Sequence, residues 1–499
     1  MTSAMNLWPI GNCEIAALVD AKASICWGCL PRFDGDPVFC SLLEPKEEHG
    51  FWDIVLENCT SIEQHYVRNT PVLVTRMSCA AGNVIEITDF MPRFPRHGRM
   101  FRPTAIARIV RVISGSPRIS VRLRPAHGWG EGKPVSTAGS NHIRYILGEQ
   151  TQRLTCNAPL GWVRDERMFR VERDLHFYFG PDEGFDAGLE ATLESMLEQT
   201  VSTWQHWVRG LNLPLEWQEA VIRAAITLKL CQYEQTGAIV AALTTSLPEH
   251  ADSERNWDYR FCWVRDAYFT VQALNRLGAL DVLESYLHYL RNIVDAARGG
   301  HIQPLYGIGG EATLIEHIMP ALNGFDGMGP VRSGNQAYEQ IQHDAYGQII
   351  LSNVQAFFDQ RLLRRTTIQD FEALEVVGHR AFDMFDQPDA GLWELRTRAH
   401  VHTYSAAMCW AACDRLANAA NAIGRPEASQ FWAGRAEHIR AHIDQNAWSH
   451  EGNHYSAVLG ERTLDASLLQ LLDLKFIRAD DPRFISTLDA IETGLRRGS

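Results

Sequence analysis

The spacing of the apolar residues changes once along this chain, and that change restricts the fold more than any other feature. Up to about residue 190 the apolar residues occur in short runs with a period of about 2, which is typical of β-strands. Residues 15–19 and 24–27 flank the turn sequence Asp-Ala-Lys-Ala, which indicates a hairpin. Further strands are expected at 71–77, 84–88, 105–113, 118–124, 142–147 and 169–178. Many short strands at this spacing predict an antiparallel β-sandwich.

Beyond about residue 190 the period lengthens to about 3.6, so helices replace strands. The sequence therefore predicts an α+β multidomain protein, with a β-sandwich domain at 1–188, a helical linker at 189–214 and a helical domain at 215–499. A run of paired helices after a β domain predicts a helical toroid, in which loops at one end build a pocket. The helices are expected near 215–235, 264–279, 281–297, 335–363, 367–385, 403–422, 426–446, 463–474 and 482–497.

The net charge argues against nucleic acid as a partner. The chain carries a formal charge of -13 at pH 7, whereas a surface that binds phosphates must be basic. No basic region followed by an apolar run opens the chain, and no apolar run is long enough to span a bilayer. The 11 cysteines are odd in number and scattered, which is typical of reduced thiols. We therefore expect a cytoplasmic protein that does not associate with membranes.

Two short motifs resemble metal or redox sites. Cys26 and Cys29 form a lone C-x-x-C, which is better explained by two buried thiols on a strand because no second ligand pair accompanies it. His400 and His402 have no acidic or thiol partner at ligand spacing, so we interpret them as polar loop residues. The sequence thus predicts neither a metal nor a cofactor.

Residues 256–266 place aromatic rings at every second position and end in a cation and an anion. Helical spacing begins at Val264, so Arg265 and Asp266 are expected where an extended segment becomes a helix. Aromatic rings stack on the apolar face of a pyranose, and a charged pair hydrogen-bonds its hydroxyls. The alternative is a core strand followed by a helix with a favourable Asp in its first turn, but the charged pair favours a sugar site. The rings expected to face one side are those of Trp257, Tyr259, Phe261 and Trp263.

Residues 389–396 deliver Trp393 and Glu394 just ahead of the helix expected from residue 403. The neighbouring Trp and Leu would desolvate the carboxyl of Glu394, raise its pKa and keep it protonated near neutral pH, as a general acid requires. Arg396 opposes this if its guanidinium faces Glu394, because a nearby cation favours the ionised form. A surface glutamate in a loop that caps a helix is an equally good interpretation of this motif alone.

A third polar segment lies at residues 331–347. Tyr338, Gln342 and Tyr346 recur at every fourth position, which places them on one face of the expected helix. Gln342 and Asp344 are candidates for hydrogen bonds to sugar hydroxyls. A polar stripe on a solvated helix is the alternative interpretation.

Two motifs, Trp-Val-Arg-Asp at 263–266 and Leu-Trp-Glu at 392–394, are specific enough to point to a known family. Together with matching segments through essentially the whole chain, they resemble glycoside hydrolase family 15. That family contains glucoamylases, glucodextranases and bacterial trehalases. The other matching segments lie at 10–12, 17–20, 30–34 and 87–92 in the β domain, and at 237–249, 257–266 and 391–394 in the catalytic domain.

The resemblance implies an (α/α)6 barrel that hydrolyses an α-glucosidic bond with inversion. It implies an exo-acting enzyme that releases glucose from the non-reducing end of a small α-glucoside or α-glucan, so the expected partner is a small-molecule carbohydrate. By position, Glu394 matches the general acid, and Arg265 and Asp266 match the pair that holds the terminal glucose. The positions that line or support the pocket are Trp263, Leu392, Trp393, Gln342 and Asp344.

One feature of the family has no match. Its general base lies in an acidic segment on a late loop, and no such segment follows Phe476, so no general base is found in this chain. The expected helices are also fewer than the family has, which predicts that the C-terminal part of the catalytic domain is missing. An incomplete toroid exposes apolar helix faces and favours a homo-oligomer. The alternative function is a catalytically impaired relative that binds carbohydrate without cleaving it.

The glycosidic linkage is not specified by the sequence. Trehalose and α-1,4 or α-1,6 glucosides differ in how the leaving sugar sits, and the loops near 301–332 match no pattern that distinguishes them. A helical scaffold for protein partners is a third interpretation. It explains the helices but gives no role to the charged pair or to the Trp-Glu motif.

Overall fold

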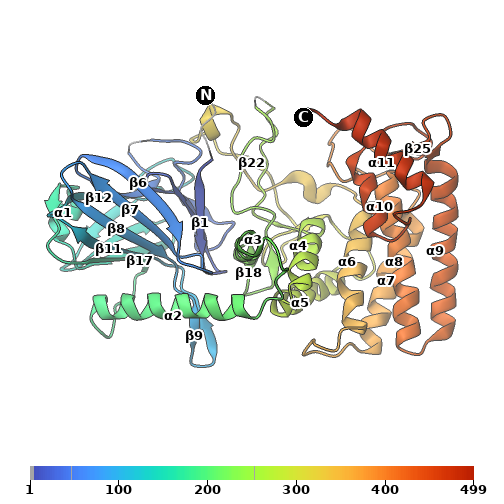
Figure 1. Ribbon diagram of the computed structural model, residues 1–499, viewed down its shortest axis with the longest axis horizontal. Helices are drawn as coiled ribbons and strands as arrows, with labels where there is room; N and C mark the ends of the chain where they lie inside the picture. The colour runs from blue at the N-terminus through green and yellow to red at the C-terminus, as the bar shows by residue number, and fades with distance from the viewer. Residues whose placement is uncertain (1–4, 47, 252, 499) are drawn as a thin grey trace.

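The computed structural model describes residues 5–46, 48–251 and 253–498. A β-sandwich and a helical region lie side by side along its longest axis (Figure 1). The predicted order, a β domain followed by helices, is confirmed. Because apolar side chains alternate along the first part of the chain and recur with helical spacing along the second, each part builds its own core.

The sandwich is built from two antiparallel sheets that face each other across an apolar core. The first sheet has seven strands in the described part of the chain, and the hairpin predicted around residues 20–23 is confirmed by the pairing of its second and third strands. In order of pairing, these strands are β1 (Leu7–Gly11), β2 (Ala16–Asp20), β3 (Ile25–Leu30), β5 (Phe51–Leu56), β12 (Arg118–Arg124) and β16 (Phe169–Arg170), with β4 (Asp36–Phe39) paired to β3.

The second sheet has eight strands among the same residues. Inward-pointing residues of the two sheets, such as Ile54, Val121 and Phe177, are buried in one cluster, as two packed sheets with alternating side chains require. In order of pairing, the strands are β13 (Val135–Ala138), β14 (His142–Leu147), β15 (Gln150–Cys156), β17 (Leu175–Pro181), β11 (Ile106–Ser114), β8 (Val84–Phe90), β7 (Leu73–Cys79) and β6 (Cys59–Tyr66).

One strand prediction is wrong in detail. The strand expected at 169–178 is divided between β16 and β17, which belong to different sheets. The chain leaves the first sheet after Arg170 and joins the second at Leu175. Alternating residues identify extended backbone, but they do not specify which sheet a segment joins, because that depends on distant partners.

Helix α2 (Leu189–Arg209) covers the outer face of the second sheet. Its buried residues Leu193 and Met196 pack against Val72 and Phe90. The helix starts at the predicted residue and runs below the sandwich in Figure 1. It therefore closes one side of the sandwich before the chain enters the helical region.

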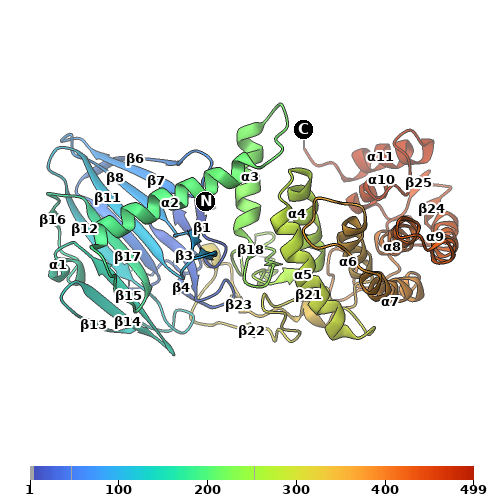
Figure 2. The ribbon, with the colours of Figure 1, turned by 90° about the horizontal axis from the view of Figure 1, so that it is seen from below.

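The helical region is a series of helix pairs that extends away from the sandwich (Figure 2). Its helices are α3 (Gln218–Leu230), α4 (Val264–Arg276), α5 (Leu280–Ala297), α6 (Asp344–Val354), α7 (Ile368–Met384), α8 (Thr403–Ala422), α9 (Pro426–Ala447), α10 (Gln470–Asp473) and α11 (Pro482–Leu495). Helices α4 and α5, α6 and α7, and α8 and α9 pack as pairs, and α6 also packs between α4 and α8. This is the packing of a barrel wall made of helical hairpins; closure into an (α/α)6 barrel stays a prediction.

The helix expected at 335–363 is interrupted. Its first part is a 3-10 turn, η2 (Gln336–Glu339), which the side chain of Asn335 caps, and α6 begins only at Asp344. Between them the chain is hydrogen-bonded to the loop at 389–391 instead of continuing the helix. The residues predicted to share one helix face, Tyr338, Gln342 and Tyr346, therefore lie on different elements.

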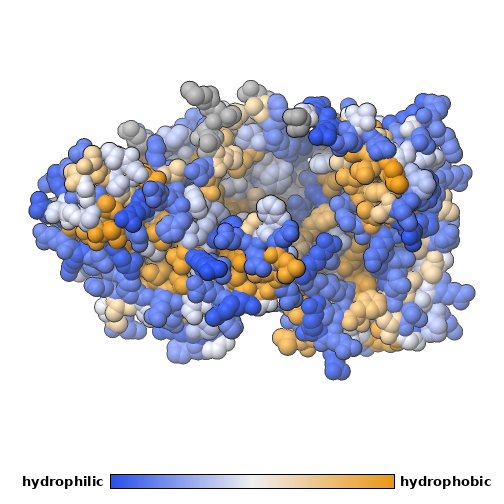
Figure 3. All heavy atoms as spheres, viewed as in Figure 1, coloured by the Kyte–Doolittle hydropathy of each residue, from blue (hydrophilic) through white to orange (hydrophobic). Residues whose placement is uncertain are grey.

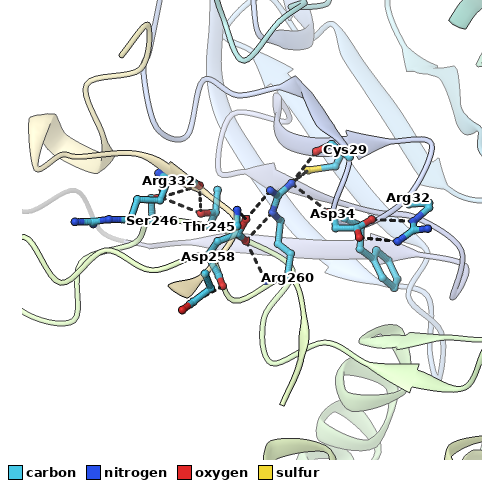
Figure 4. Close-up of polar contacts among 12 residues, drawn as sticks. Cys29, Arg32, Asp34, Thr245, Ser246, Asp258, Arg260 and Arg332 are labelled. Carbon is cyan, nitrogen blue, oxygen red and sulfur yellow. Dashed lines mark hydrogen bonds and ion pairs between the residues drawn. The ribbon is translucent and has the colours of Figure 1, made fainter. Parts of the chain in front are cut away.

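A fully buried ion pair connects the sandwich to the helical region (Figure 4). Arg260 binds the two carboxylate oxygens of Asp258 at 2.9 and 2.7 Å. It also donates at 2.7 Å to the carbonyl of Gly35 and at 3.4 Å to Sγ of Cys29, both in the sandwich. Asp258 accepts at 3.2 Å from the N–H of Gly334. Arg260 thus ties the sandwich to the segment that leads into α4.

The two motifs that resembled metal sites have ordinary surroundings. Cys26 and Cys29 are free thiols buried on β3, as predicted, and burial raises the pKa of each to about 12. His400 and His402 lie half-buried in the loop before α8. Within the described residues no group of three or more His, Cys, Asp or Glu side chains could hold a metal ion. Nor does that part of the chain contain a helix long and apolar enough to cross a membrane.

Candidate active site

A cavity of about 750 Å³ lies where the segment leading into α4, the turn η2 and the loop before α8 meet. On the face drawn in Figure 3 the surface is hollowed near the middle, between the sandwich and the last helices. Three of the residues predicted for a sugar site, Trp263, Gln342 and Asp344, lie buried behind the lining. The predicted residues that line the cavity itself are Arg265, Asp266, Leu392, Trp393 and Glu394.

Glu394 enters the cavity from the loop before α8. Its N–H is 3.3 Å from the carbonyl oxygen of Gly391, and its backbone is left-handed, with φ of 52°. The side chain is 16% exposed. Its Oε1 accepts a hydrogen bond from Nε1 of Trp263 at 2.7 Å and another from the guanidinium of Arg265 at 3.0 Å. The two sequence motifs that lie far apart in the chain therefore meet at this oxygen.

Arg265 lies in the first turn of α4, just after the extended segment ends. Besides Glu394, its guanidinium contacts Oε1 of Gln342 at 3.1 Å and Oδ2 of Asp266 at 3.5 Å. Burial opposes its charge, but the carboxylates of Asp266, Glu394 and Asp344 outweigh that effect and raise its pKa. Arg265 is thus the permanent cation among the acidic groups of the site.

Asp266 is next in the same helical turn, where the helix dipole favours a negative charge. Its side chain is 43% exposed, but Oδ2 is buried and no described residue donates a hydrogen bond to it. Burial raises the pKa of Asp266, the charge of Glu394 adds to this, and Arg265 opposes it. Because the side chain is 43% exposed and lines the cavity, its carboxylate can accept a hydrogen bond from a hydroxyl group.

Gln342 and Asp344 are almost fully buried behind Arg265. Gln342 accepts from Arg265 and donates at 3.1 Å to Oε1 of Gln340. Asp344 begins α6 and accepts from Nε2 of Gln348 at 2.7 Å, whereas its Oδ1 has no hydrogen-bond partner among the described residues. Burial raises the pKa of Asp344, and the charge of Arg265 opposes that rise. Gln342 therefore acts on the cavity through Arg265.

The aromatic residues at 257–263 have different surroundings. Tyr259, Phe261 and Trp263 contribute to one apolar cluster, and the rings of Tyr259 and Trp263 are 5.4 Å apart. Trp257 instead packs against guanidinium groups. Strand pairing is limited to β20 (Cys262–Trp263) and an isolated bridge at Asp258, so the expected regular wall of four rings is only partly formed.

Leu392 and Trp393 form the outer part of the lining. Leu392 is half-buried against the helical core, whereas Trp393 is 55% exposed. Nε1 of Trp393 donates at 2.5 Å to Oδ2 of Asp465, which caps the turn before α10. The indole is therefore held by its edge and leaves a ring face free to contact a ligand.

Asp389 is a buried acid whose role the sequence did not indicate. Its Oδ2 accepts at 2.8 Å from both the N–H of His343 and the hydroxyl of Ser405, and its Oδ1 accepts from the N–H of Gly391 at 3.2 Å. Burial, reinforced by the charge of Asp344, raises its pKa to about 7. Asp389 thus fixes the start of the loop that carries Glu394. Its position just before a Gly ahead of a helix was the available signal.

Arg396, whose direction the sequence left open, turns away from Glu394. Its Nη2 lies 2.8 Å from Oε2 of Glu316, and its guanidinium carbon lies 3.8 Å from the ring centre of Trp257. The cation beside Glu394 is Arg265 instead. No sequence pattern pairs Glu316 with Arg396, because 80 residues separate them.

Another acidic residue of the lining was not predicted. Within the described part of the chain, the acidic residues that line the cavity are Glu249, Asp266 and Glu394. Glu249 accepts from the hydroxyl of Tyr259 at 3.0 Å and from Nε of Arg255 at 2.5 Å. It ends the segment 237–249, which the resemblance covered without giving any of its residues a role.

Family models cover both parts of the chain. The model for glycosyl hydrolases family 15 matches residues 217–498, and the model for the trehalase-like N-terminal domain matches residues 6–153. The first match covers more than half of the chain.

Two curated relatives and one solved structure extend these matches. The trehalase of Thermoplasma volcanium is 29% identical over 97% of this chain and 78% of its own length. The trehalase of Mycolicibacterium smegmatis is 30% identical over 97% of this chain and 75% of its own length. A bacterial glucoamylase solved in complex with acarbose has the same fold, with a TM-score of 0.65 at 13% identity over 98% of this chain and 78% of that one. The chain therefore belongs to glycosyl hydrolases family 15 and is a glycoside hydrolase.

Proposed function

We propose that this enzyme hydrolyses a small α-glucoside from its non-reducing glucose with inversion, and that trehalose is its substrate. The relatives named trehalase match 97% of the chain, and these matches support trehalose over other glucosides. A cavity of about 750 Å³ lies within the range of roughly 300–1,000 Å³ that is usual for small ligands.

The arrangement of Glu394 is the observation that carries this proposal. Both hydrogen bonds that its carboxyl receives from described residues end on Oε1, one from Trp263 and one from Arg265. Two donors on one oxygen leave Oε2 without a hydrogen bond from a described residue, so Oε2 is the oxygen that can face the glycosidic bond. In this proposal Glu394 gives a proton to the glycosidic oxygen as the bond to the anomeric carbon breaks.

Groups around Glu394 stabilise the carboxylate that is left after proton transfer and bind the sugar. Arg265 stabilises the carboxylate that remains after proton transfer, because it already contacts Oε1. Asp266 accepts hydrogen bonds from hydroxyls of the glucose that is attacked, since its side chain is open to the cavity. Trp393 packs against the sugar with its free ring face.

Inversion also needs a carboxylate that activates water, at roughly 6.5–9.5 Å from the acid. Apart from Glu394, the acidic residues of the lining in the described part of the chain are Asp266 and Glu249. Asp266 binds the sugar in this proposal, so Glu249 is the residue to test as the base. In Glu249→Gln, azide replaces the activated water if Glu249 is the base, and β-glucosyl azide accumulates. Failure of azide to restore turnover removes Glu249 from that role.

The test of the whole proposal is the anomeric form of the first product. The enzyme is incubated with trehalose, maltose and isomaltose, and proton NMR is recorded before the products mutarotate. Inversion of trehalose gives α-glucose and β-glucose in equal amounts, because only the attacked sugar changes configuration. Product that is α-glucose alone would overturn inversion. Absence of any glucose, with binding retained in calorimetry, would favour the impaired carbohydrate-binding relative. Glu394→Gln serves as the background control.

A further inference from the structure

The loop that carries Glu394 is held at a second point, downstream of the acid. Nη2 of Arg396 lies 2.8 Å from Oε2 of Glu316, and Nη1 lies 3.4 Å from Oε1 of the same carboxylate. Glu316 also accepts from Nε of Arg332 at 3.1 Å and from the N–H of Gln336 at 3.2 Å. Glu316 therefore joins two arginines from separate segments.

Trp257 lies against the same two arginines. The guanidinium carbon of Arg396 is 3.8 Å from the centre of its ring, and that of Arg332 is 4.5 Å away. A guanidinium over an aromatic face is attracted to the electrons of the ring. We call Trp257, Glu316, Arg332 and Arg396 the arginine bracket.

The far end of the arginine bracket is fixed to the interior (Figure 4). The N–H of Arg332 donates to Oγ of Ser246 at 2.7 Å, and its carbonyl accepts from the hydroxyl of Thr245 at 2.8 Å. Nη1 of Arg332 donates to the carbonyl of Asn256 at 2.9 Å. The neighbouring Gly334 is bonded to Asp258, which Arg260 connects to the sandwich. Arg332 is thus a rigid support for Glu316.

Glu394 needs such support because its backbone conformation is unfavourable. The left-handed region is unfavourable for a residue other than Gly, and Glu394 has φ of 52° in a loop without regular structure. Asp389 fixes the loop five residues before Glu394. Arg396 fixes it two residues after Glu394. The acid therefore lies between two anchored points.

We propose that Arg396 is a positioning residue, which holds the carboxyl of Glu394 in line with the glycosidic oxygen through its contacts with Glu316 and Trp257. This inference rests on the proposed role of Glu394 as general acid. Arg396 lines the cavity, but its guanidinium pairs with Glu316, and it binds no reacting atom in the proposal. Its removal misplaces the proton donor without altering the donor's chemistry, and a shift of about 1 Å can lower a rate by about 100-fold.

The test compares a substrate that needs the proton with one that does not. Trehalose releases an alcohol and requires protonation of the leaving oxygen, whereas α-glucosyl fluoride releases fluoride as the anion and depends far less on an acid. In Arg396→Ala, we expect kcat on trehalose to fall by about 10–100-fold, with KM changed by less than about 3-fold. On α-glucosyl fluoride kcat falls by less than about 3-fold. Glu316→Gln, which keeps the side-chain size but loses the charge, has the same selective effect to a smaller degree.

Arg398 provides the matched control. It is an exposed arginine on the same loop, two residues beyond Arg396. We expect Arg398→Ala to leave kcat and KM unchanged on both substrates. Far-UV circular dichroism and thermal melts verify that each variant is folded, and Glu316→Gln remains a test if Arg396→Ala does not fold.

Two results would overturn the inference. An equal loss on both substrates in Arg396→Ala and Glu316→Gln would show that the arginine bracket maintains the cavity as a whole. No loss on either substrate would show that Glu394 needs no support from Arg396. Failure of the proposed function is recognised separately: the wild-type enzyme would then release no glucose from trehalose, or Glu394→Gln would keep the wild-type kcat on trehalose.

Discussion

Charged side chains have different hydrogen-bonding environments in the sandwich and in the cavity. In the sandwich, Arg108 and Asp89 are both 0% exposed, and they bind each other at 2.7 and 3.1 Å. Arg108 also donates to the carbonyls of Trp52 and Ala23 at 2.8 and 2.6 Å. In the cavity, by contrast, the side chain of Asp266 is 43% exposed, and no described residue donates a hydrogen bond to its Oδ2.

The difference separates a structural ion pair from a binding group. A buried pair whose hydrogen bonds are made within the protein has little left to offer a ligand, and removing either partner strands the other in a medium of low polarity. A carboxylate that is open to a cavity keeps acceptor capacity for a donor such as a sugar hydroxyl. The same residue types therefore serve stability in one region and recognition in the other.

The largest expected effect is on stability, from a change in the sandwich. Asp89→Asn leaves Arg108 buried without its anion, so we expect the free energy of unfolding to fall by about 3–5 kcal/mol. Urea unfolding followed by circular dichroism measures this, and kcat at a temperature where the variant is folded should match the wild type. A loss of less than about 1 kcal/mol would break the comparison, because the pair would then not be structural.

The corresponding change in the cavity is Asp266→Asn. We expect kcat/KM on trehalose to fall by about 10–100-fold, equivalent to roughly 1.5–3 kcal/mol, because hydrogen bonds from a neutral hydroxyl to a charged acceptor are lost. The melting temperature should change little, since the contact of Oδ2 with Arg265 is long, at 3.5 Å, and the nearby charge of Glu394 opposes that of Asp266. Steady-state kinetics and a thermal melt on the same sample check both parts. A destabilised variant with unchanged kcat/KM would show that Asp266 serves stability and not substrate binding.

We expect the ionisation of Asp389 to make the free energy of unfolding depend on pH. Its pKa is raised to about 7 in the folded protein, against about 3.9 for an unfolded Asp, so the folded state holds one more proton between these values. The free energy of unfolding contributed by this group therefore falls as pH rises from about 4 to 7, with a slope of up to about 1.4 kcal/mol per pH unit. Asp389→Asn should remove that slope in urea titrations at several pH values. A slope equal to that of the wild type would show that other groups cause it.

The smallest effect is expected at the mouth of the cavity. Trp393→Phe keeps an aromatic ring but loses the N–H that donates to Asp465, at a position that is 55% exposed. We expect less than about 1 kcal/mol in stability and less than about 3-fold in kcat/KM. Trp263→Phe, which removes the donor to Glu394 inside the protein, is the buried counterpart and should cost more in kcat. Equal effects of the two substitutions would mean that burial does not distinguish these indoles.

The sequence predicted what depends on local spacing. The boundaries of α8 were predicted at residues 403 and 422, where the helix begins and ends, because a strong apolar period continues through the whole segment. The hairpin of β2 and β3 was predicted for the same reason. The meeting of Arg265 with Glu394 was indicated by the family resemblance, not by spacing, since 129 residues separate them.

Features that depend on distant partners were not predicted. The interruption at Gln340 to His343 follows from hydrogen bonds to the loop at 389–391, which no local pattern reveals. The direction of Arg396 depends on Glu316, and the position of Glu249 in the lining depends on the fold of a long loop. Such contacts depend on three-dimensional packing between residues that lie far apart in the sequence, so local sequence patterns do not predict them.

The buried position of Arg260 also sets the minimum part of the chain that an active form of this enzyme must contain. Its guanidinium is bonded to the carbonyls of Phe33 and Gly35, which the helical region cannot supply for itself. If the helical region were expressed alone, the N–H groups of the Arg260 guanidinium would face water beside the segment that carries Arg265. A chimera that exchanges the sandwich for that of another enzyme must therefore bring a carbonyl-rich turn to the same place, and the minimal catalytic unit includes both halves.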